Sequence, residues 1–190
     1  MTHRIWTAAC VWVVALMAQA AAAGPLAPSA LRCEYLVNPM GIDVTSPRLF
    51  WTPQHTGRGI VQAAYQVLVS ASPAAEAGDL WDSGRVASSE FTHVVYAGPP
   101  LESTRTYYWK VRYWDQEGQP SPYSDTARFE MGLLAASGWK AKWISGGNQL
   151  RKEFVLAAKP IRARAYVAGL GYYELRLNGR KVGDHVLDPG

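Results

Sequence analysis

The chain has 190 residues, which is room for one domain or two small ones. Its hydrophobic content of 48% is that of a globular protein. The formal net charge is only +4, and Arg and Lys are scattered without a long basic run. The composition therefore argues against a disordered chain and gives no support to nucleic-acid binding.

Residues 1–23 are predicted to be a signal peptide. Arg4 gives a short positive region, residues 5–17 are mostly apolar, and Ala-x-Ala cleavage choices follow at 18–20 and 21–23. The apolar run is shorter than the roughly 20 residues of a membrane span, although an uncleaved anchor is the alternative. We expect an exported bacterial protein, secreted or periplasmic, with no membrane segment after cleavage.

The cysteine content determines whether this protein can be stabilised by an internal disulfide. Cleavage of the leader removes Cys10 and leaves Cys33 alone, and one cysteine cannot form an internal disulfide. The exported chain therefore needs a core large enough to fold without such a bond. We expect Cys33 to be a small buried hydrophobic residue.

Residues 24–32 are rich in Pro, Ala and Ser and are expected to be a linker. Residues 54–59, with two glycines, are expected to be a loop. Turn signals then separate about seven short strand-like segments within residues 33–131. This pattern predicts an all-β fold, an antiparallel β-sandwich. The expected strands are residues 31–36, 47–51, 63–70, 80–86, 91–96, 106–115 and 127–131.

The clearest alternation runs through residues 106–115. Successive side chains of a strand point to opposite faces. One face is therefore predicted to be core, with Tyr107, Trp109, Val111 and Tyr113. The opposite face holds Tyr108, Lys110, Arg112 and Trp114.

Residues 132–149 are expected to be a linker, and residues 150–190 a second unit. Its expected strands are 150–156, 161–167 and 172–177, with a hairpin at Asn178-Gly179. About 40 residues are too few to bury a sandwich core without a partner. We therefore expect the first strands of a second, incomplete β-sandwich.

The first unit resembles a fibronectin type III domain, a member of the immunoglobulin-like sandwiches. Leu101 followed by Tyr107 resembles the corner that precedes the sixth strand, where a tyrosine hydroxyl bonds upstream backbone. The other matching positions are Trp51-Thr52-Pro53, Tyr65-x-Val67-x-Val69, Gly118, Ser121 and Ser124.

The sequence from about Leu31 onward resembles the N-terminal region of bacterial α-L-rhamnosidases of glycoside hydrolase family 78. The matching runs include 31–39 with 41–43, 78–84, 107–112, 129–134 with 139–144, 169–179, 183–184 and 188–190. The resemblance implies β-sandwich domains placed before an (α/α)6 barrel whose acidic residues hydrolyse terminal α-L-rhamnose with inversion. No part of this chain matches the barrel.

The resemblance therefore implies an accessory N-terminal fragment, and whether the chain itself is an enzyme stays uncertain. Its expected partners are the missing C-terminal catalytic domain in cis and rhamnose-containing glycans. The alternatives are a non-catalytic carbohydrate-binding module and a spacer.

We assign no catalytic, cofactor-binding or metal-binding residue, and we expect no cofactor. Inverting glycosidases need two carboxyl groups about 6.5–9.5 Å apart. The most closely spaced acidic residues are expected to lie on the solvated surface and in turns; they are Glu153, Glu174, Asp184 and Asp188. A calcium site at Asp184 and Asp188 is the alternative, but two acids do not supply enough ligands. The histidines lack the spacing of a zinc site; they are His3, His55, His93 and His185.

Four tryptophans could offer flat faces to a sugar. Trp114 is more strongly expected to pack on a neighbouring domain, since tryptophans dominate interfaces. Trp139 and Trp143 are expected to anchor the linker, and Trp81 is the fourth.

Overall fold

A computed structural model of the chain describes residues 24–73, 78–184 and 186. These residues form two units that divide between Ala141 and Lys142. The signal peptide expected at residues 1–23 lies outside the described residues. Within the described part of the chain, no helix has the length and apolar character needed to cross a membrane.

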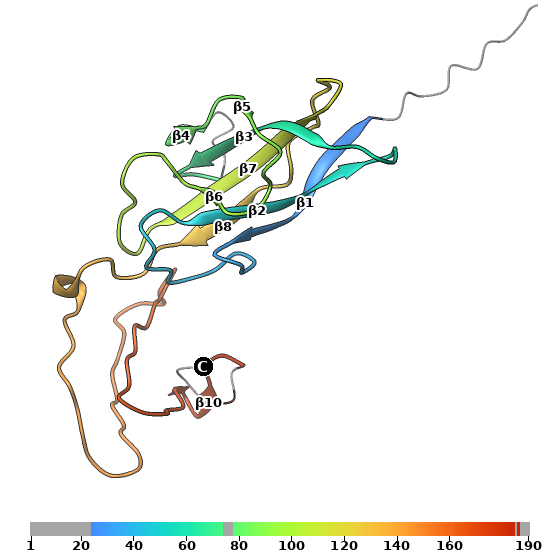
Figure 1. Cartoon of the computed structure of the whole chain (residues 1–190). Helices are drawn as coiled ribbons and strands as arrows, with labels where there is room; N and C mark the ends of the chain where they lie inside the picture. Colours follow the sequence, from blue (N-terminus) through green and yellow to red (C-terminus); the bar gives the residue numbers. More distant parts are fainter. Residues whose placement is uncertain (1–23, 74–77, 185, 187–190) are drawn as a thin grey trace, which may run out of the picture. The chain divides into compact units, whose positions relative to one another are not determined.

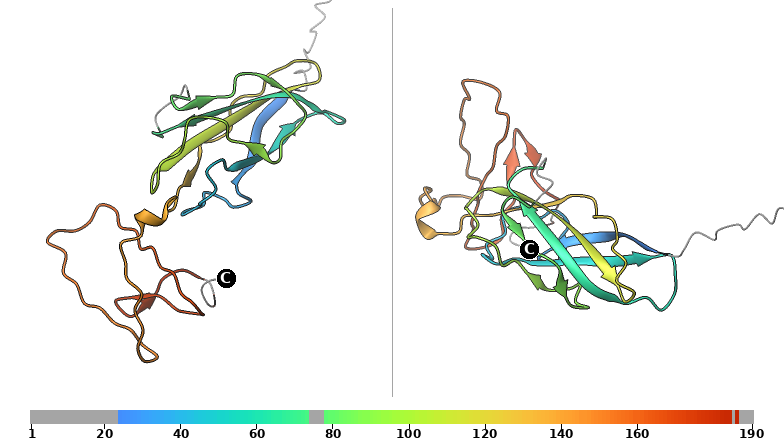
Figure 2. Two further views of the ribbon diagram at one scale, coloured as in Figure 1. Left: turned by 60° about the vertical axis from the view of Figure 1, so that its left-hand side comes forward. Right: turned by 90° about the horizontal axis from the view of Figure 1, so that it is seen from above.

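The first unit is a sandwich of two antiparallel sheets (Figures 1 and 2). The smaller sheet has the order β1-β2-β6, with β1 at Pro25–Cys33, β2 at Arg48–His55 and β6 at Val94–Val95. The larger sheet has the order β4-β3-β7-β8, and β5 pairs with another part of β3. Its strands are β3 (Gln62–Ser70), β4 (Trp81–Asp82), β5 (Val86–Ala87), β7 (Thr106–Asp115) and β8 (Ala127–Glu130). The all-β fold predicted from the alternating segments is confirmed.

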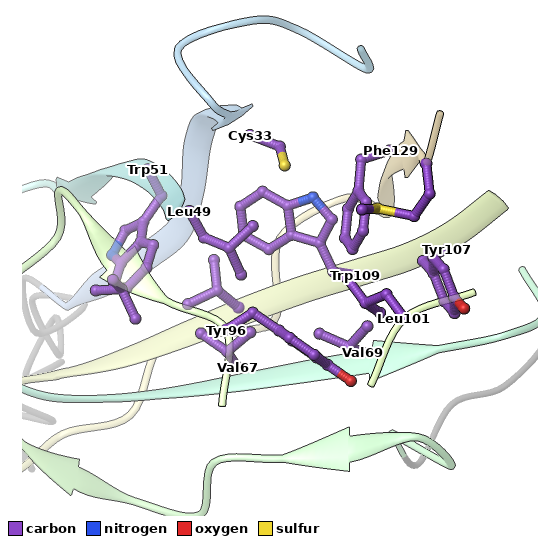
Figure 3. Packing of buried hydrophobic residues seen from close by; sticks show 13 residues of the cluster. Cys33, Leu49, Trp51, Val67, Val69, Tyr96, Leu101, Tyr107, Trp109 and Phe129 are labelled. Atoms are coloured by element: carbon purple, nitrogen blue, oxygen red, sulfur yellow. The ribbon is translucent and has the colours of Figure 1, made fainter. Parts of the chain in front are cut away.

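Both sheets contribute to one core between them (Figure 3). The predicted inner face of β7 is buried, with Tyr107, Trp109, Val111 and Tyr113 each at most 1% exposed. Cys33 is also 1% exposed, as expected of a small hydrophobic residue. Burial raises the pKa of its thiol to about 12, because a thiolate loses its hydration there. Residues that face β7 across the core include Leu49, Trp51 and Val94.

The tyrosine corner forms as predicted. Leu101 is buried, and the Tyr107 hydroxyl accepts a 2.8 Å hydrogen bond from the backbone N–H of Glu102. The Tyr107 ring lies 5.5 Å, centroid to centroid, from that of Phe129. The corner therefore fixes the entry into β7 through one polar and one apolar contact.

The segment after β7 runs beside this strand and is tied to it by two serines. β8 pairs with only the first part of β7, from Thr106 to Trp109. Farther along, Val111 donates its N–H to Ser124 Oγ and Tyr113 donates its N–H to Ser121 Oγ, each at 3.1 Å. Each serine also donates its backbone N–H to the carbonyl of the same β7 residue, at 2.8 Å. Ser121 and Ser124 thus replace a paired strand along the second half of β7.

Residues 24–32 are not the expected linker. Pro25–Cys33 is strand β1, which pairs antiparallel with β2 and has two register shifts. Pro25 and Pro28 are tolerated because β1 is an edge strand with one neighbour, where a missing N–H need not interrupt the sheet. The expected loop at residues 54–59 is also shorter, because β2 continues to His55.

The second unit, described by itself, has far less strand than expected. No strand forms at residues 150–156 or 161–167, and of residues 172–177 only Arg176–Leu177 is a strand, β9. β9 pairs with β10, Arg180–Lys181, around the predicted Asn178-Gly179 turn. Both turn residues have positive φ, 49° and 77°, as a two-residue hairpin of this type requires. The apolar stretches at 150–156 and 161–167 are exposed. They form no strand because no neighbouring strand supplies partners for their backbone hydrogen bonds.

Candidate functional site on the outer face of the larger sheet

The outer face of the larger sheet gathers aromatic and basic side chains. The β3–β7 register places Lys110 beside Leu68, Arg112 beside Gln66 and Trp114 beside Ala64. These side chains point away from the core, because their neighbours on β7 point into it. Lys110 and Arg112 are half-buried, so they remain reachable from solvent.

Three cations and two rings alternate across this face. The Arg112 guanidinium carbon lies 4.7 Å from the Trp114 ring centroid and 4.8 Å from that of Tyr123. Arg85 lies over Trp114 at 4.9 Å, and Lys110 Nζ lies over Tyr123 at 4.9 Å. We call these five residues the cation–π ladder. Contacts of this kind are each worth about 0.5–1 kcal/mol at exposed sites.

Hydrogen bonds hold the middle of the ladder. Gln66 Oε1 accepts from Arg112 Nε at 2.9 Å and from the Tyr123 hydroxyl at 3.0 Å. Burial raises the pKa of Tyr123, with Asp82 also raising it and the Arg112 charge opposing the shift. The Gln66 amide donates to Asp82 Oδ1 at 2.7 Å. The arrangement fixes charged donors on a sheet face.

A small hollow opens beside the ladder. It has a volume of about 10 Å³, and Leu68, Tyr108, Lys110 and Thr126 are among its lining residues. A site that encloses a small ligand usually has about 300–1,000 Å³. This face is therefore suited to contact along a surface and not to enclosure of a small molecule.

A second cluster lies at the turn after β1. Glu34 and Tyr35 both have positive φ, 48° and 67°, which is strained for residues other than glycine. The strain is offset by contacts: Glu34 pairs with Arg48, whose guanidinium also lies 4.9 Å from the Tyr35 ring centroid. The hydrogen bond from Arg48 lowers the pKa of Glu34. Phe50 and His93 complete the cluster, with His93 Nε2 2.9 Å from the Tyr35 hydroxyl.

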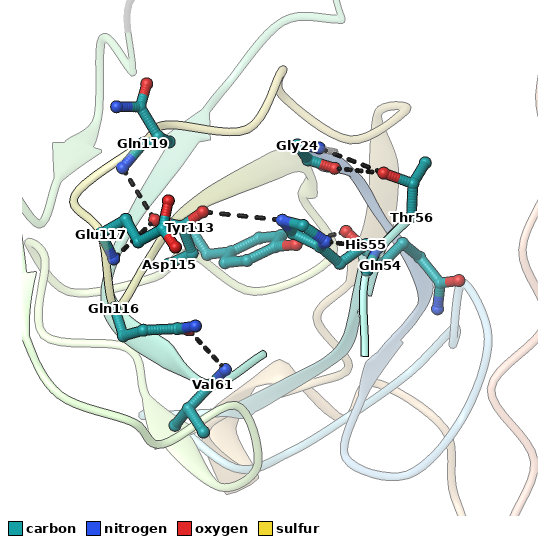
Figure 4. Close-up of polar contacts among 11 residues, drawn as sticks. Gly24, Gln54, His55, Thr56, Val61, Tyr113, Asp115, Gln116, Glu117 and Gln119 are labelled. Carbon is teal, nitrogen blue, oxygen red and sulfur yellow. Dashed lines mark hydrogen bonds and ion pairs between the residues drawn. The ribbon is translucent and has the colours of Figure 1, made fainter. Parts of the chain in front are cut away.

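His55 takes part in a group of local polar contacts at the end of β2 (Figure 4). Its Nδ1 accepts from the Gly57 N–H at 2.8 Å, so Nε2 carries the proton of the neutral ring and faces Asp115 Oδ2 at 3.6 Å. Asp115 Oδ1 also accepts from the backbone N–H groups of Glu117 and Gln119. His55 and His93 belong to separate local contacts, and the described residues contain no cluster of three or more metal-binding side chains.

The acidic residues considered from the sequence are not brought together as a catalytic pair. Glu153 forms an exposed ion pair with Arg151. Glu174 lies 2.6 Å from Arg176 Nε and 3.8 Å from Lys181 Nζ. Asp184 is exposed, and Asp188 lies outside the described residues.

The tryptophans divide into packed and exposed ones. Trp114 is 8% exposed and is packed within its own domain, under Arg85 and Arg112. Trp81 packs edge-on against Tyr96, with ring centroids 5.1 Å apart. Trp139 and Trp143 are 42% and 71% exposed, so neither anchors the connection by burial.

Sequence reasoning placed three of the five ladder residues on one face and missed the other two. The alternation of β7 assigned Lys110, Arg112 and Trp114 to one face, but nothing local indicated that Arg85 and Tyr123 would join them. The signal that could have found Tyr123 is its position between Ser121 and Ser124, whose bonds to β7 bring the intervening side chain onto the sheet face.

Two family models match this chain. Residues 28–135 match the Rha78A-like, N-terminal immunoglobulin domain, and residues 158–190 match the α-L-rhamnosidase N-terminal domain. The first match covers more than half of the chain and contains both sheets of the sandwich. The second covers the hairpin of the second unit.

Relatives and solved structures agree with these matches. An α-L-rhamnosidase of Formosa agariphila is 38% identical over 185 residues, covering 80% of this chain and 19% of that protein. The structure of Streptomyces avermitilis α-L-rhamnosidase complexed with L-rhamnose is 43% identical, with a TM-score of 0.61, and covers 63% of this chain and 12% of that one. An Aspergillus terreus α-L-rhamnosidase structure is 27% identical, with a TM-score of 0.63, and covers 86% and 20%.

The chain thus spans about a fifth of the length of the Formosa agariphila relative. Its sandwich and its hairpin unit follow each other in the order of the two matching models. The chain therefore belongs to the Rha78A-like N-terminal immunoglobulin domain family and has the N-terminal region of an α-L-rhamnosidase.

Proposed function

We propose that this chain is the accessory N-terminal region of an exported α-L-rhamnosidase and has no hydrolase activity by itself. The observation that carries the proposal is the pair of matches to N-terminal rhamnosidase domains in a chain that covers 19% of a full-length relative. In the parent enzyme, a C-terminal catalytic domain in cis hydrolyses terminal α-L-rhamnose with inversion. The leader expected at residues 1–23 directs the protein to the periplasm or the medium.

The chemistry of the described residues supports an accessory role. Inversion needs a carboxylic acid and a carboxylate about 6.5–9.5 Å apart on either side of the glycosidic bond. Glu34, Glu153 and Glu174 are each paired with an arginine. The hydrogen bond from Arg48 also lowers the pKa of Glu34, which does not suit that carboxyl group as the general acid.

The test is hydrolysis of an aryl α-L-rhamnoside by the purified chain from Gly24 onward. We expect no release of the aryl group above the rate in buffer, while an α-L-rhamnosidase assayed in parallel gives rapid release. Turnover that co-purifies with the chain through two chromatographic steps would refute the proposal. Reading the DNA downstream tests the same proposal separately, since a long open frame with a helical-barrel pattern supports it and a stop codon opposes it.

A second candidate function is non-catalytic binding of a rhamnose-containing glycan. The exposed rings of Trp139 and Trp143 favour it, because a flat aromatic face can stack on a sugar. Titration of L-rhamnose should then change the tryptophan fluorescence of the chain, and the change should be lost in Trp143→Ala. If neither sugar nor glycan alters the fluorescence, the remaining role is that of a spacer.

A further inference from the structure

Four basic side chains form a row along the outer face of the larger sheet. The β7–β8 register places Arg128 beside Tyr108, on the same face as Lys110 and Arg112. Arg85 continues the row over the Trp114 ring. The row therefore advances along β7 in steps of two residues, or about 6.5–7 Å each.

This row is the unusual part of an otherwise acidic domain. Residues 24–141 contain 9 Arg and Lys against 11 Asp and Glu, a formal charge of 9 − 11 = −2. Among the described residues, none of the four basic side chains forms an ion pair with a carboxylate. Asp82 and Glu130 are acidic groups on this face. Asp82 Oδ1 already accepts from the Gln66 amide and the Gly84 N–H, and Glu130 is buried and accepts from the Thr106 hydroxyl.

Contacts within the ladder order these charged groups before any ligand binds. Stacking on Trp114 and Tyr123 orders the guanidinium groups of Arg85 and Arg112. Arg85 is exposed and Arg112 is half-buried, so both groups can be reached from solvent. Donors ordered in advance lose less entropy when a ligand binds. Guanidinium groups also bind carboxylate and sulfate through paired N–H bonds.

We propose that this row binds a linear acidic polysaccharide, one that carries carboxylate or sulfate groups on successive sugars. The hollow at Lys110 is too small to enclose a ligand, whereas a row of cations on a flat face fits a row of anions. A polysaccharide is favoured over a nucleic acid because both rings of the ladder are covered by cations and cannot stack on bases. This binding goes beyond the accessory role proposed above, and neither depends on the other.

The test is binding of polygalacturonate to the full chain, measured by calorimetry, with neutral dextran of similar length as the reference polymer. Binding should be seen for polygalacturonate, should be absent for dextran, and should weaken as salt is raised, since the charges are exposed to solvent. The double variant Lys110→Gln, Arg128→Gln should bind about tenfold more weakly, equivalent to about 1.4 kcal/mol.

The matched control is the double variant Arg32→Gln, Arg58→Gln, which removes the same charge from exposed positions outside this face. It should keep the wild-type affinity within about twofold, because screening limits distant charges. Amide shifts of the unaltered chain give a second reading that needs no variant: β7 residues 108–114 should move on addition of polygalacturonate. An equal loss in both double variants, or shifts elsewhere, would overturn the proposal.

A single-stranded DNA of equal charge separates the two classes of polyanion. It should bind at least tenfold more weakly than polygalacturonate. Equal or tighter binding of the DNA, or no binding of polygalacturonate at low salt, would also overturn the proposal. None of these results bears on whether the chain hydrolyses a rhamnoside.

Discussion

The Tyr107 hydroxyl offers a sharp test of how the sandwich is held together. Tyr107→Phe removes one oxygen and leaves the ring in contact with Phe129, so the apolar packing is unchanged. The backbone N–H of Glu102 then loses its 2.8 Å acceptor. Leaving a partly buried donor without a partner costs about 1–3 kcal/mol.

The loss should appear in urea unfolding of the chain, followed by tryptophan fluorescence. With an m value of about 2 kcal/mol per molar urea, the midpoint should fall by roughly 0.5–1.5 M. The matched control is Tyr108→Phe, whose hydroxyl has no hydrogen bond within the described part of the chain. Its midpoint should change by less than about 0.3 M, since surface changes stay within about 0.5 kcal/mol.

The reasoning fails if the two variants lose the same stability, or if Tyr107→Phe leaves the midpoint unchanged. An equal loss would mean that tyrosine hydroxyls in general are favourable here. An unchanged midpoint would mean that water replaces the tyrosine hydroxyl at Glu102 without cost. An unchanged m value is needed in both variants, because only then does the midpoint report stability.

Three further predictions follow from burial and pairing. The Cys33 thiol ionises near 9.0 when unfolded and near 12 when folded, so unfolding releases a proton in that window and stability should fall as pH rises from 9 to 12. The fall should be smaller in Cys33→Ala, as measured by urea midpoints across that range. The pKa of Glu34 is lowered from 4.5 by its hydrogen bond with Arg48, so its contribution is present above pH 4.5 and is lost as pH falls through the folded pKa. Glu34→Gln should therefore flatten the loss of stability in acid, and an unchanged acid profile would contradict the pairing. In hydrogen exchange, amides of β7 should be protected for far longer than those of residues 150–167, which have no strand partner; slow exchange in the latter would reveal an unforeseen partner.

The elements that could be predicted are those whose pattern is local. The alternation of β7 follows from adjacent residues, and its inner face was identified in full. The spacing of Leu101 and Tyr107 predicted a corner that needs few other contacts. The Asn178-Gly179 hairpin formed for the same reason, since its geometry is set by the two turn residues.

The elements that could not be predicted depend on distant partners. Pro25–Cys33 has the composition of a linker and becomes a strand because β2 supplies hydrogen bonds to its edge. Trp114 is buried by Arg85, which comes from the β4–β5 region and not from a neighbour in sequence. The apolar stretches at 150–156 and 161–167 have the composition of strands but no strand beside them. Composition alone therefore overestimated the strand content of the second unit.

The hydrogen bonds of Ser121 and Ser124 with β7 bear on how this domain avoids aggregation. Beyond Trp109, β7 has no partner in β8, and an unpaired strand edge readily pairs with another molecule. Ser121 and Ser124 occupy the N–H and C=O groups of Tyr113 and Val111 that would otherwise recruit a second chain. Two serines thus close this part of the sheet edge, through both their hydroxyls and their backbone N–H groups.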